Sequence, residues 1–129
     1  MPVLGFNHYN LRASRAVMEQ LREFYVSVLG LHVGERPPFA SVGYWLYLGD
    51  QAILHLSMAG DDDPRSLHVS STFDHVALSC ADLTGMLAHL DALGVRYRRS
   101  EVPLLGQVQL FLQDPAGNGI ELNFAASTS

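Results

Sequence analysis

Apolar residues recur at intervals of three or four in two stretches of the chain, and each stretch ends at Leu-Gly. This period predicts two amphipathic helices. Ser14 suits the N-cap of the first helix and Asp82 that of the second, while Gly30 and Gly94 suit their ends. The apolar positions of the first helix are Val17, Met18, Leu21, Phe24, Val28 and Leu29. Those of the second are Leu83, Met86, Leu87, Leu90 and Leu93.

Short apolar or alternating segments, bounded by turn residues, predict one strand before each helix and three after it. The predicted strands of the first half cover residues 3–11, 31–35, 43–48 and 52–58, and those of the second half cover 73–79, 96–100, 107–113 and 119–124. The polar stretch between them, residues 60–71, contains Asp61-Asp62-Asp63-Pro64 and is typical of a linker. We therefore expect an α+β fold, a single domain over residues 1–129 with half-modules 1–59 and 72–126.

The two halves also repeat each other at the level of single residues. The segment Phe6-Asn7-His8 is matched by Phe73-Asp74-His75, and Ile53-Leu54-His55-Leu56 is matched by Gly119-Ile120-Glu121-Leu122. The repeat therefore places four residues of metal-binding type at corresponding positions: His8 with His75, and His55 with Glu121.

Side chains of a strand alternate between its two faces, so the repeat also predicts where these residues point. His55 and Glu121 alternate with aliphatic residues that should pack under the helices, and His8 and His75 have the matching parity in their own strands. We expect all four side chains to face a shared concavity. The same alternation makes five further residues candidates for lining a substrate pocket: Trp45, Tyr47, Gln109, Phe111 and Asn123.

Composition narrows the classes of partner. The chain has 129 residues, 48% apolar and 16% charged, and its net charge is −5 without a single lysine. An acidic chain of this kind argues against nucleic acids and anionic membranes as partners. No apolar run reaches the length of a membrane span, and Cys80 is the only cysteine. We therefore expect a cytoplasmic protein without an internal disulfide.

The motifs of the repeat resemble those of the vicinal oxygen chelate superfamily, which includes glyoxalase I, fosfomycin-resistance thiol transferases, extradiol dioxygenases and bleomycin-resistance proteins. The resemblance rests on Asn7-His8, Gly49-Asp50 and Asp74-His75, on the Leu-Gly-Leu after the first helix, and most specifically on Asp114-Pro115-Ala116-Gly117-Asn118-Gly119-Ile120-Glu121-Leu122. It implies two βαβββ modules that form an eight-stranded cup around a metal site. A homodimer is a further implication.

Carried over residue by residue, the resemblance makes His8, His75 and Glu121 metal ligands. His55 falls at the fourth ligand position, where glyoxalase I carries Glu, so Glu121 remains as the one evident carboxylate base. Imidazoles combined with a carboxylate suit a divalent transition metal (Zn, Ni, Fe, Mn or Co) rather than Ca²⁺ or Mg²⁺.

These features predict a metal-dependent, glyoxalase-like lyase or isomerase. Its partner would be a small-molecule substrate that chelates the metal through neighbouring oxygens. Three alternatives stay open. An Fe(II) extradiol-type dioxygenase would use His8, His75 and Glu121 without His55. A thiol transferase acting on fosfomycin and a non-catalytic drug- or metabolite-binding protein are the other two.

Overall fold

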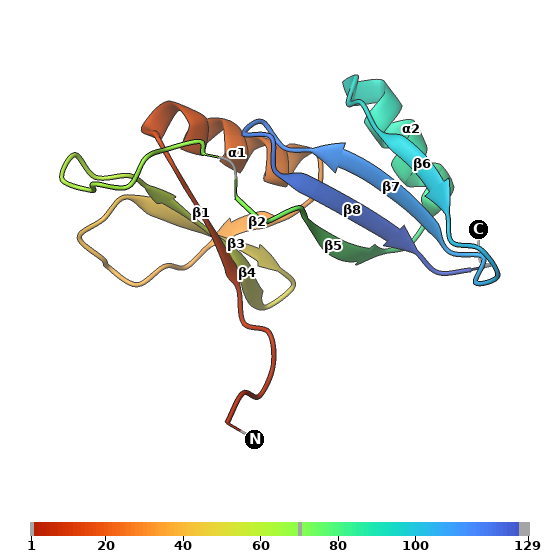
Figure 1. Cartoon of the computed structure of the whole chain (residues 1–129), viewed down its shortest axis with the longest axis horizontal. Helices are drawn as coiled ribbons and strands as arrows, with labels where there is room; N and C mark the ends of the chain where they lie inside the picture. Colours follow the sequence, from red (N-terminus) through yellow and green to blue (C-terminus); the bar gives the residue numbers. More distant parts are fainter. Residues whose placement is uncertain (1, 70, 127–129) are drawn as a thin grey trace. The chain divides into compact units, whose positions relative to one another are not determined.

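The computed structural model describes residues 2–69 and 71–126. The chain divides into two compact units, Met1–Val69 and Ser70–Ser129. The first unit contains β1 (Tyr9–Ala13), α1 (Arg15–Ser27), β2 (His32–Gly34), β3 (Gly43–Leu48) and β4 (Gln51–Met58). The second contains β5 (His75–Cys80), α2 (Leu83–Leu93), β6 (Arg98–Glu101), β7 (Val108–Gln113) and β8 (Gly119–Phe124) (Figure 1). The predicted α+β class and its two βαβββ modules are confirmed.

Each unit builds one four-stranded sheet, and the two sheets have the same topology. The strand order is β1-β4-β3-β2 in the first unit and β5-β8-β7-β6 in the second. In both units the first strand pairs in parallel with the last, and the remaining pairs are antiparallel. The repeat in the sequence is thus a repeat in topology.

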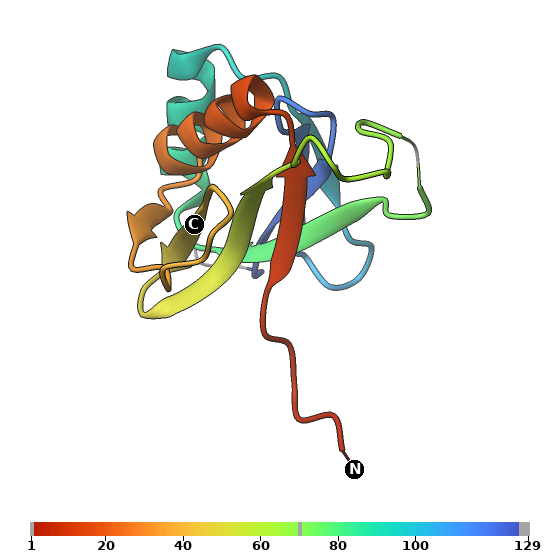
Figure 2. The same cartoon turned by 90° about the vertical axis from the view of Figure 1, so that its left-hand side faces the viewer.

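Helix α1 lies across one face of the first sheet (Figure 2). The Ser14 hydroxyl accepts a hydrogen bond from the Val17 amide at 3.4 Å, which caps the start of the helix as predicted. The face that turns to the sheet buries Met18, Leu21 and Tyr25 completely. Tyr25 was missing from the predicted apolar face, which assigned that place to its neighbour Phe24. The helical period decides between them, because a residue seven positions after Met18 returns to the same side of the helix.

Helix α2 begins and ends where the sequence predicts. The Asp82 carboxylate accepts a hydrogen bond from the Gly85 amide at 3.1 Å, and Gly94 ends the helix in the left-handed region, at φ 68°. Leu90 is its fully buried residue, whereas Leu93 is 49% exposed. The core of the second unit is formed mainly by strand residues, namely Leu110, Leu112, Ile120, Leu122 and Phe124.

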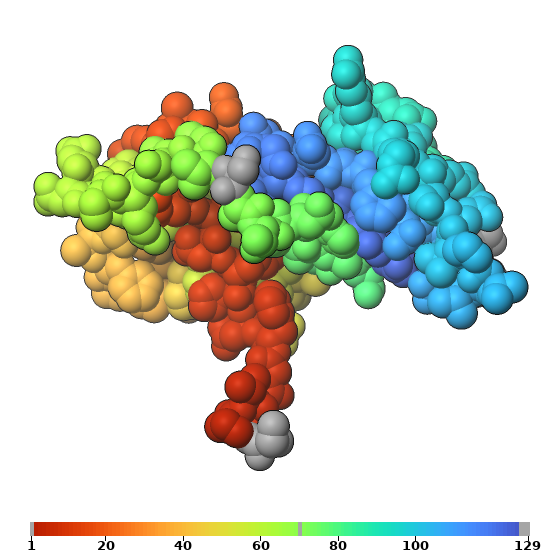
Figure 3. Space-filling view, in the orientation of Figure 1, coloured from red at the N-terminus to blue at the C-terminus, as the bar shows by residue number. Residues whose placement is uncertain are grey.

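The first strand is shorter than predicted. Residues 3–8 precede β1, and the segment before Asn7 extends away from the first unit (Figure 3, red end), with Val3, Leu4 and Phe6 exposed. Since β1 is an edge strand, one of its sides has no neighbour to extend the sheet. The predicted strand over residues 3–11 is therefore wrong for residues 3–8, and His8 lies immediately before β1.

The burial of Leu21 in α1 and the exposure of Leu93 in α2 predict different effects of alanine substitution on the free energy of unfolding. Leu21→Ala should lower the free energy of unfolding by about 2–5 kcal/mol, because Leu21 is 1% exposed and its loss leaves a cavity. Leu93→Ala, the matched control, should cost less than about 0.5 kcal/mol. Urea unfolding followed by circular dichroism measures both values. Equal costs would contradict the packing described for α1.

Candidate functional site

In the first unit His55 is held between two aromatic rings. His55 lies on β4, where it is opposite Trp45 of β3 on one side and Asn10 of β1 on the other. Asn10 is two residues after His8 in the sequence. The rings of His8 and His55 stack at 3.7 Å between centroids and 15° between planes. The Trp45 ring stacks on His55 at 4.1 Å and 10°. Two rings cannot share one face of an imidazole, so His8 and Trp45 cover opposite faces of His55.

This environment favours the uncharged form of His55. Burial lowers the pKa of His55, and the charges of His8 and Arg36 lower it further. The neutral imidazole is the form that binds metal ions. His55 therefore has the right protonation state for a ligand.

His8 differs from His55 in its exposure and in its polar contacts. Its Nδ1 lies 2.7 Å from the Asn7 Oδ1, and since that oxygen can only accept, Nδ1 donates. The lone pair is then on Nε2. Because the His8 and His55 rings are stacked and nearly parallel, their lone pairs lie in two separate planes and do not converge on one point. Binding of one metal by both residues requires His8 to turn, and its exposed position leaves room for that.

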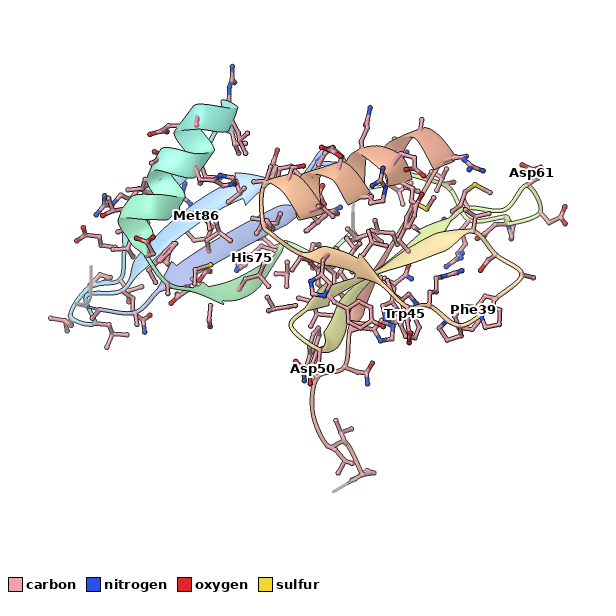
Figure 4. All side chains as sticks on the ribbon, turned by 180° about the vertical axis from the view of Figure 1, so that it is seen from behind. Phe39, Trp45, Asp50, Asp61, His75 and Met86 are labelled. Carbon is pink, nitrogen blue, oxygen red and sulfur yellow. The ribbon has the colours of Figure 1, made fainter. Side chains whose placement is uncertain are left out.

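In the second unit His75 and Glu121 form an ion pair. They lie on the parallel strands β5 and β8, and His75 Nε2 is 3.3 Å from Glu121 Oε1. Asn123 donates to the other Glu121 oxygen at 3.1 Å, which fixes the carboxylate. The Asp74 carboxylate binds His75 Nδ1 at 2.7 Å, as Asn7 binds His8 in the first unit. Figure 4 labels His75 on its strand.

The two carboxylates around His75 favour its charged form. The hydrogen bond to Asp74 raises the pKa of His75, and the negative charges of Asp74 and Glu121 raise it further. A proton on Nε2 thus occupies the place between imidazole and carboxylate that a divalent cation could take.

The donor atoms of both pairs suit a divalent transition metal. Two ligands at about 2.0–2.2 Å from a metal, bound at right angles, are about 3 Å apart, close to the separation of the His75 and Glu121 donors. A side-chain oxygen on the far ring nitrogen is the usual support for a metal-binding histidine, and both His8 and His75 have one. Over the described residues, 2–69 and 71–126, no group of three or more His, Cys, Asp or Glu side chains is gathered as a metal site.

The first unit also contains a cavity of about 460 Å³ beside its histidine pair. Its lining includes His8, His55, Trp45, Arg36, Phe39 and Ser41. Sequence reasoning named the first three and missed the last three, which belong to the loop before β3. Figure 4 shows the labelled Phe39 and Trp45 near each other, and their rings are 6.3 Å apart. The sequence signal that could have indicated this part of the lining is Phe39, an aromatic residue that follows Pro37-Pro38 in a loop.

The other four residues predicted to line a pocket are not part of the lining of this cavity, and they lie on β3, β7 and β8. The Tyr47 hydroxyl donates to the backbone carbonyl of Glu35 at 2.6 Å. Phe111 lies edge-on to His75 at 6.0 Å, on the strand beside Glu121. Gln109 and Asn123 are directly opposite each other on β7 and β8.

The chain is similar to known proteins both in a family model and in solved structures. The family model described as "Glyoxalase/Bleomycin resistance protein/Dioxygenase superfamily" matches residues 5–122. A search of curated proteins returned no match. In the described part of the chain no helix is long and apolar enough to cross a membrane.

Three solved structures illustrate the likeness. A glyoxalase family protein from Enterococcus faecalis is 23% identical with a TM-score of 0.68, over 95% of this chain and 99% of its own. Lactoylglutathione lyase from Agrobacterium tumefaciens is 22% identical with a TM-score of 0.66, over 96% of each chain. An antibiotic binding protein from Streptomyces sp. CB03234 is 20% identical with a TM-score of 0.68, over 98% of this chain and 99% of its own. At these identities the likeness concerns the fold.

The contrast between the two histidines predicts opposite titration behaviour in metal-free protein. His75 should titrate above the ordinary value of 6.5, so its charged form stabilises the fold below that pH and the stabilisation disappears as pH rises through its raised pKa. His55 should titrate below 6.5, so stability falls as acid protonates it. NMR titration of the imidazole protons measures both values.

Asp74→Asn provides the control for this titration, because it places in the second unit the residue that precedes His8 in the first. The variant should bring the pKa of His75 down and leave that of His55 unchanged. An unchanged His75 titration in this variant would contradict the role given to Asp74.

Proposed function

The chain belongs to the Glyoxalase/Bleomycin resistance protein/Dioxygenase superfamily, and we propose that it is a metal-dependent, glyoxalase-like lyase or isomerase. Its substrate is a small molecule that chelates the metal through neighbouring oxygens. One observation carries the proposal. In both units a histidine at the start of the first strand has its Nδ1 held by the side chain before it, which leaves the Nε2 edge for a ligand role.

The proposed ligands are His8, His55, His75 and Glu121, two from each unit. They hold one divalent transition metal, within one chain or across a homodimer. When bound, such a metal polarises the substrate oxygens and stabilises negative charge on them. The support for this set is its donor chemistry and the 3.3 Å separation within the His75–Glu121 pair.

Glu121 is the proposed proton acceptor as well as a ligand. Its side chain is almost fully buried, and Asn123 holds one of its oxygens, so the carboxylate has a defined direction. The matching position of the first unit is occupied by His55, whose one lone pair would be taken by the metal, whereas the Glu121 carboxylate has further lone pairs that can accept a proton. Proton transfer in the proposed reaction is therefore one-sided, with the second unit supplying the base.

The stacking of His55 favours a second candidate, an Fe(II) extradiol-type dioxygenase. With His55 fixed between His8 and Trp45, the ligands would be His8, His75 and Glu121, the two-histidine and one-carboxylate set of non-haem iron oxygenases. Oxygen consumption separates the candidates. Protein loaded anaerobically with Fe(II) and then given catechol in air consumes oxygen faster than the same Fe(II) and catechol without protein only if the second candidate holds.

Metal binding is the first test of the proposed function. Purified wild-type protein, stripped and then titrated with Zn²⁺ in a calorimeter, should bind a metal ion. His75→Ala and Glu121→Gln should each weaken that binding by about tenfold or more, since each removes a proposed ligand.

His89→Ala serves as the matched control, because His89 is a histidine of α2 outside both pairs. It should bind Zn²⁺ as the wild type does. Wild-type protein that binds no transition metal would refute the enzyme and leave the small-molecule-binding alternative. Wild-type affinity in His75→Ala and Glu121→Gln would show that Zn²⁺ binds elsewhere and would contradict the proposed ligand set.

A further inference from the structure

The guanidinium of Arg36 lines the cavity of the first unit and is held there from several sides. Its two Nη atoms donate to Ser41, one to the backbone carbonyl at 3.0 Å and one to the hydroxyl at 3.1 Å. The charged group also lies over the Phe39 ring, 4.9 Å from its centroid. Arg36 is thus oriented by its own loop rather than extended into solvent.

Gly43 at the start of β3 leaves the space that this position requires. A Cβ atom there would collide first with the backbone oxygen of Leu56, and it would also lie 3.0 Å from an Nη atom of Arg36 and 3.3 Å from its Cζ. The guanidinium therefore lies directly against the backbone of β3, one strand away from His55.

The donors of Arg36 are only partly used. Ser41 engages the end of the guanidinium that carries the two Nη atoms, which leaves the side formed by Nε. The Nε group is buried and has no hydrogen-bond acceptor among the described residues. Within that same part of the chain no carboxylate forms an ion pair with Arg36. A buried donor on a charged group without an acceptor is costly, so an added hydrogen-bond acceptor beside Arg36 would be favourable.

We propose that Arg36 binds the carboxylate group of a small organic acid in this cavity. The planar guanidinium matches a carboxylate in shape and hydrogen-bonding geometry, and one positive charge balances one negative charge. Trp45 and Phe39 supply apolar surface for the rest of the molecule. Residues 37–42 are exposed, so little packing opposes the small shift that gives a carboxylate access to Nε.

This inference rests on the proposed function, because it says which class of substrate the proposed enzyme would bind in the cavity of the first unit. His8 and His55 line the same cavity as Arg36. An acid whose carboxylate is bound by Arg36 therefore occupies the space next to the proposed ligands of the first unit. The geometry thus restricts the oxygen-rich substrate to an anion.

Trp45 makes the proposal directly measurable, because it is the only tryptophan of the chain and lines the cavity. Metal-free protein is titrated with benzoate and with benzamide, which match in size and differ in charge, while Trp45 fluorescence is recorded. Benzoate should bind saturably, about tenfold or more tightly than benzamide, and added salt should weaken it. In Arg36→Gln the preference for benzoate should disappear.

Arg99→Gln is the control with the same loss of charge, made at an exposed position of β6, and it should bind benzoate as the wild type does. Near-ultraviolet circular dichroism of Trp45 checks that Arg36→Gln is folded, and Arg36→Lys should keep part of the preference. Equal binding of benzoate and benzamide by wild-type protein, or a preference that survives in Arg36→Gln, would overturn the proposal. So would inorganic phosphate that binds more tightly than benzoate.

The experiment also separates this proposal from the proposed function. It contains no metal, so benzoate binding by a protein that takes up no metal would refute the enzyme and support the anion site. Metal binding without any preference for benzoate would support the proposed ligands and refute the anion site.

Discussion

The parallel pairing of the first and last strands in each unit is the constraint on which the candidate site depends. It joins β1 to β4 and β5 to β8, strands that are far apart in the sequence. Because the two ladders have corresponding registers, the histidine at the start of one strand comes to lie beside a metal-binding side chain on the other. The stack of His8 on His55 and the ion pair of His75 with Glu121 are both products of this pairing.

The same pairing gives the two units different electrostatic environments. In the first, two imidazoles and an indole stack, and burial keeps His55 neutral. In the second, two carboxylates lie beside His75 and raise its pKa, which favours its charged form. Two changes of residue type at matching positions account for this difference: Asp74 in place of Asn7, and Glu121 in place of His55. The duplicated fold thus surrounds one histidine with carboxylates and another with aromatic rings, and the proposed base and the cavity belong to different units.

Much of the fold could be predicted from the sequence because local rules determine it. The caps at Ser14 and Asp82 depend on neighbours in the chain, and the structure has them as predicted. The burial of His55 and Glu121 together with the aliphatic residues on either side of them depends on the rest of the fold. The extent of β1 could not be predicted, because an apolar arm and an edge strand have the same pattern of residues. The sandwich around His55 depends on the register between three strands, which alternation alone does not specify. Arg36 was missed because its position is determined by Ser41, Phe39 and Gly43 in three dimensions.

The central claim, that the histidines and Glu121 are metal ligands, is tested most directly by X-ray absorption at the zinc edge of Zn²⁺-loaded protein. The predicted spectrum has imidazole nitrogens and a carboxylate oxygen at about 2.0–2.2 Å from zinc. The imidazole contribution should decrease in His75→Ala and stay unchanged in His89→Ala. A zinc surrounded by water oxygens alone, or a spectrum that is the same in wild-type protein and His75→Ala, would contradict the account.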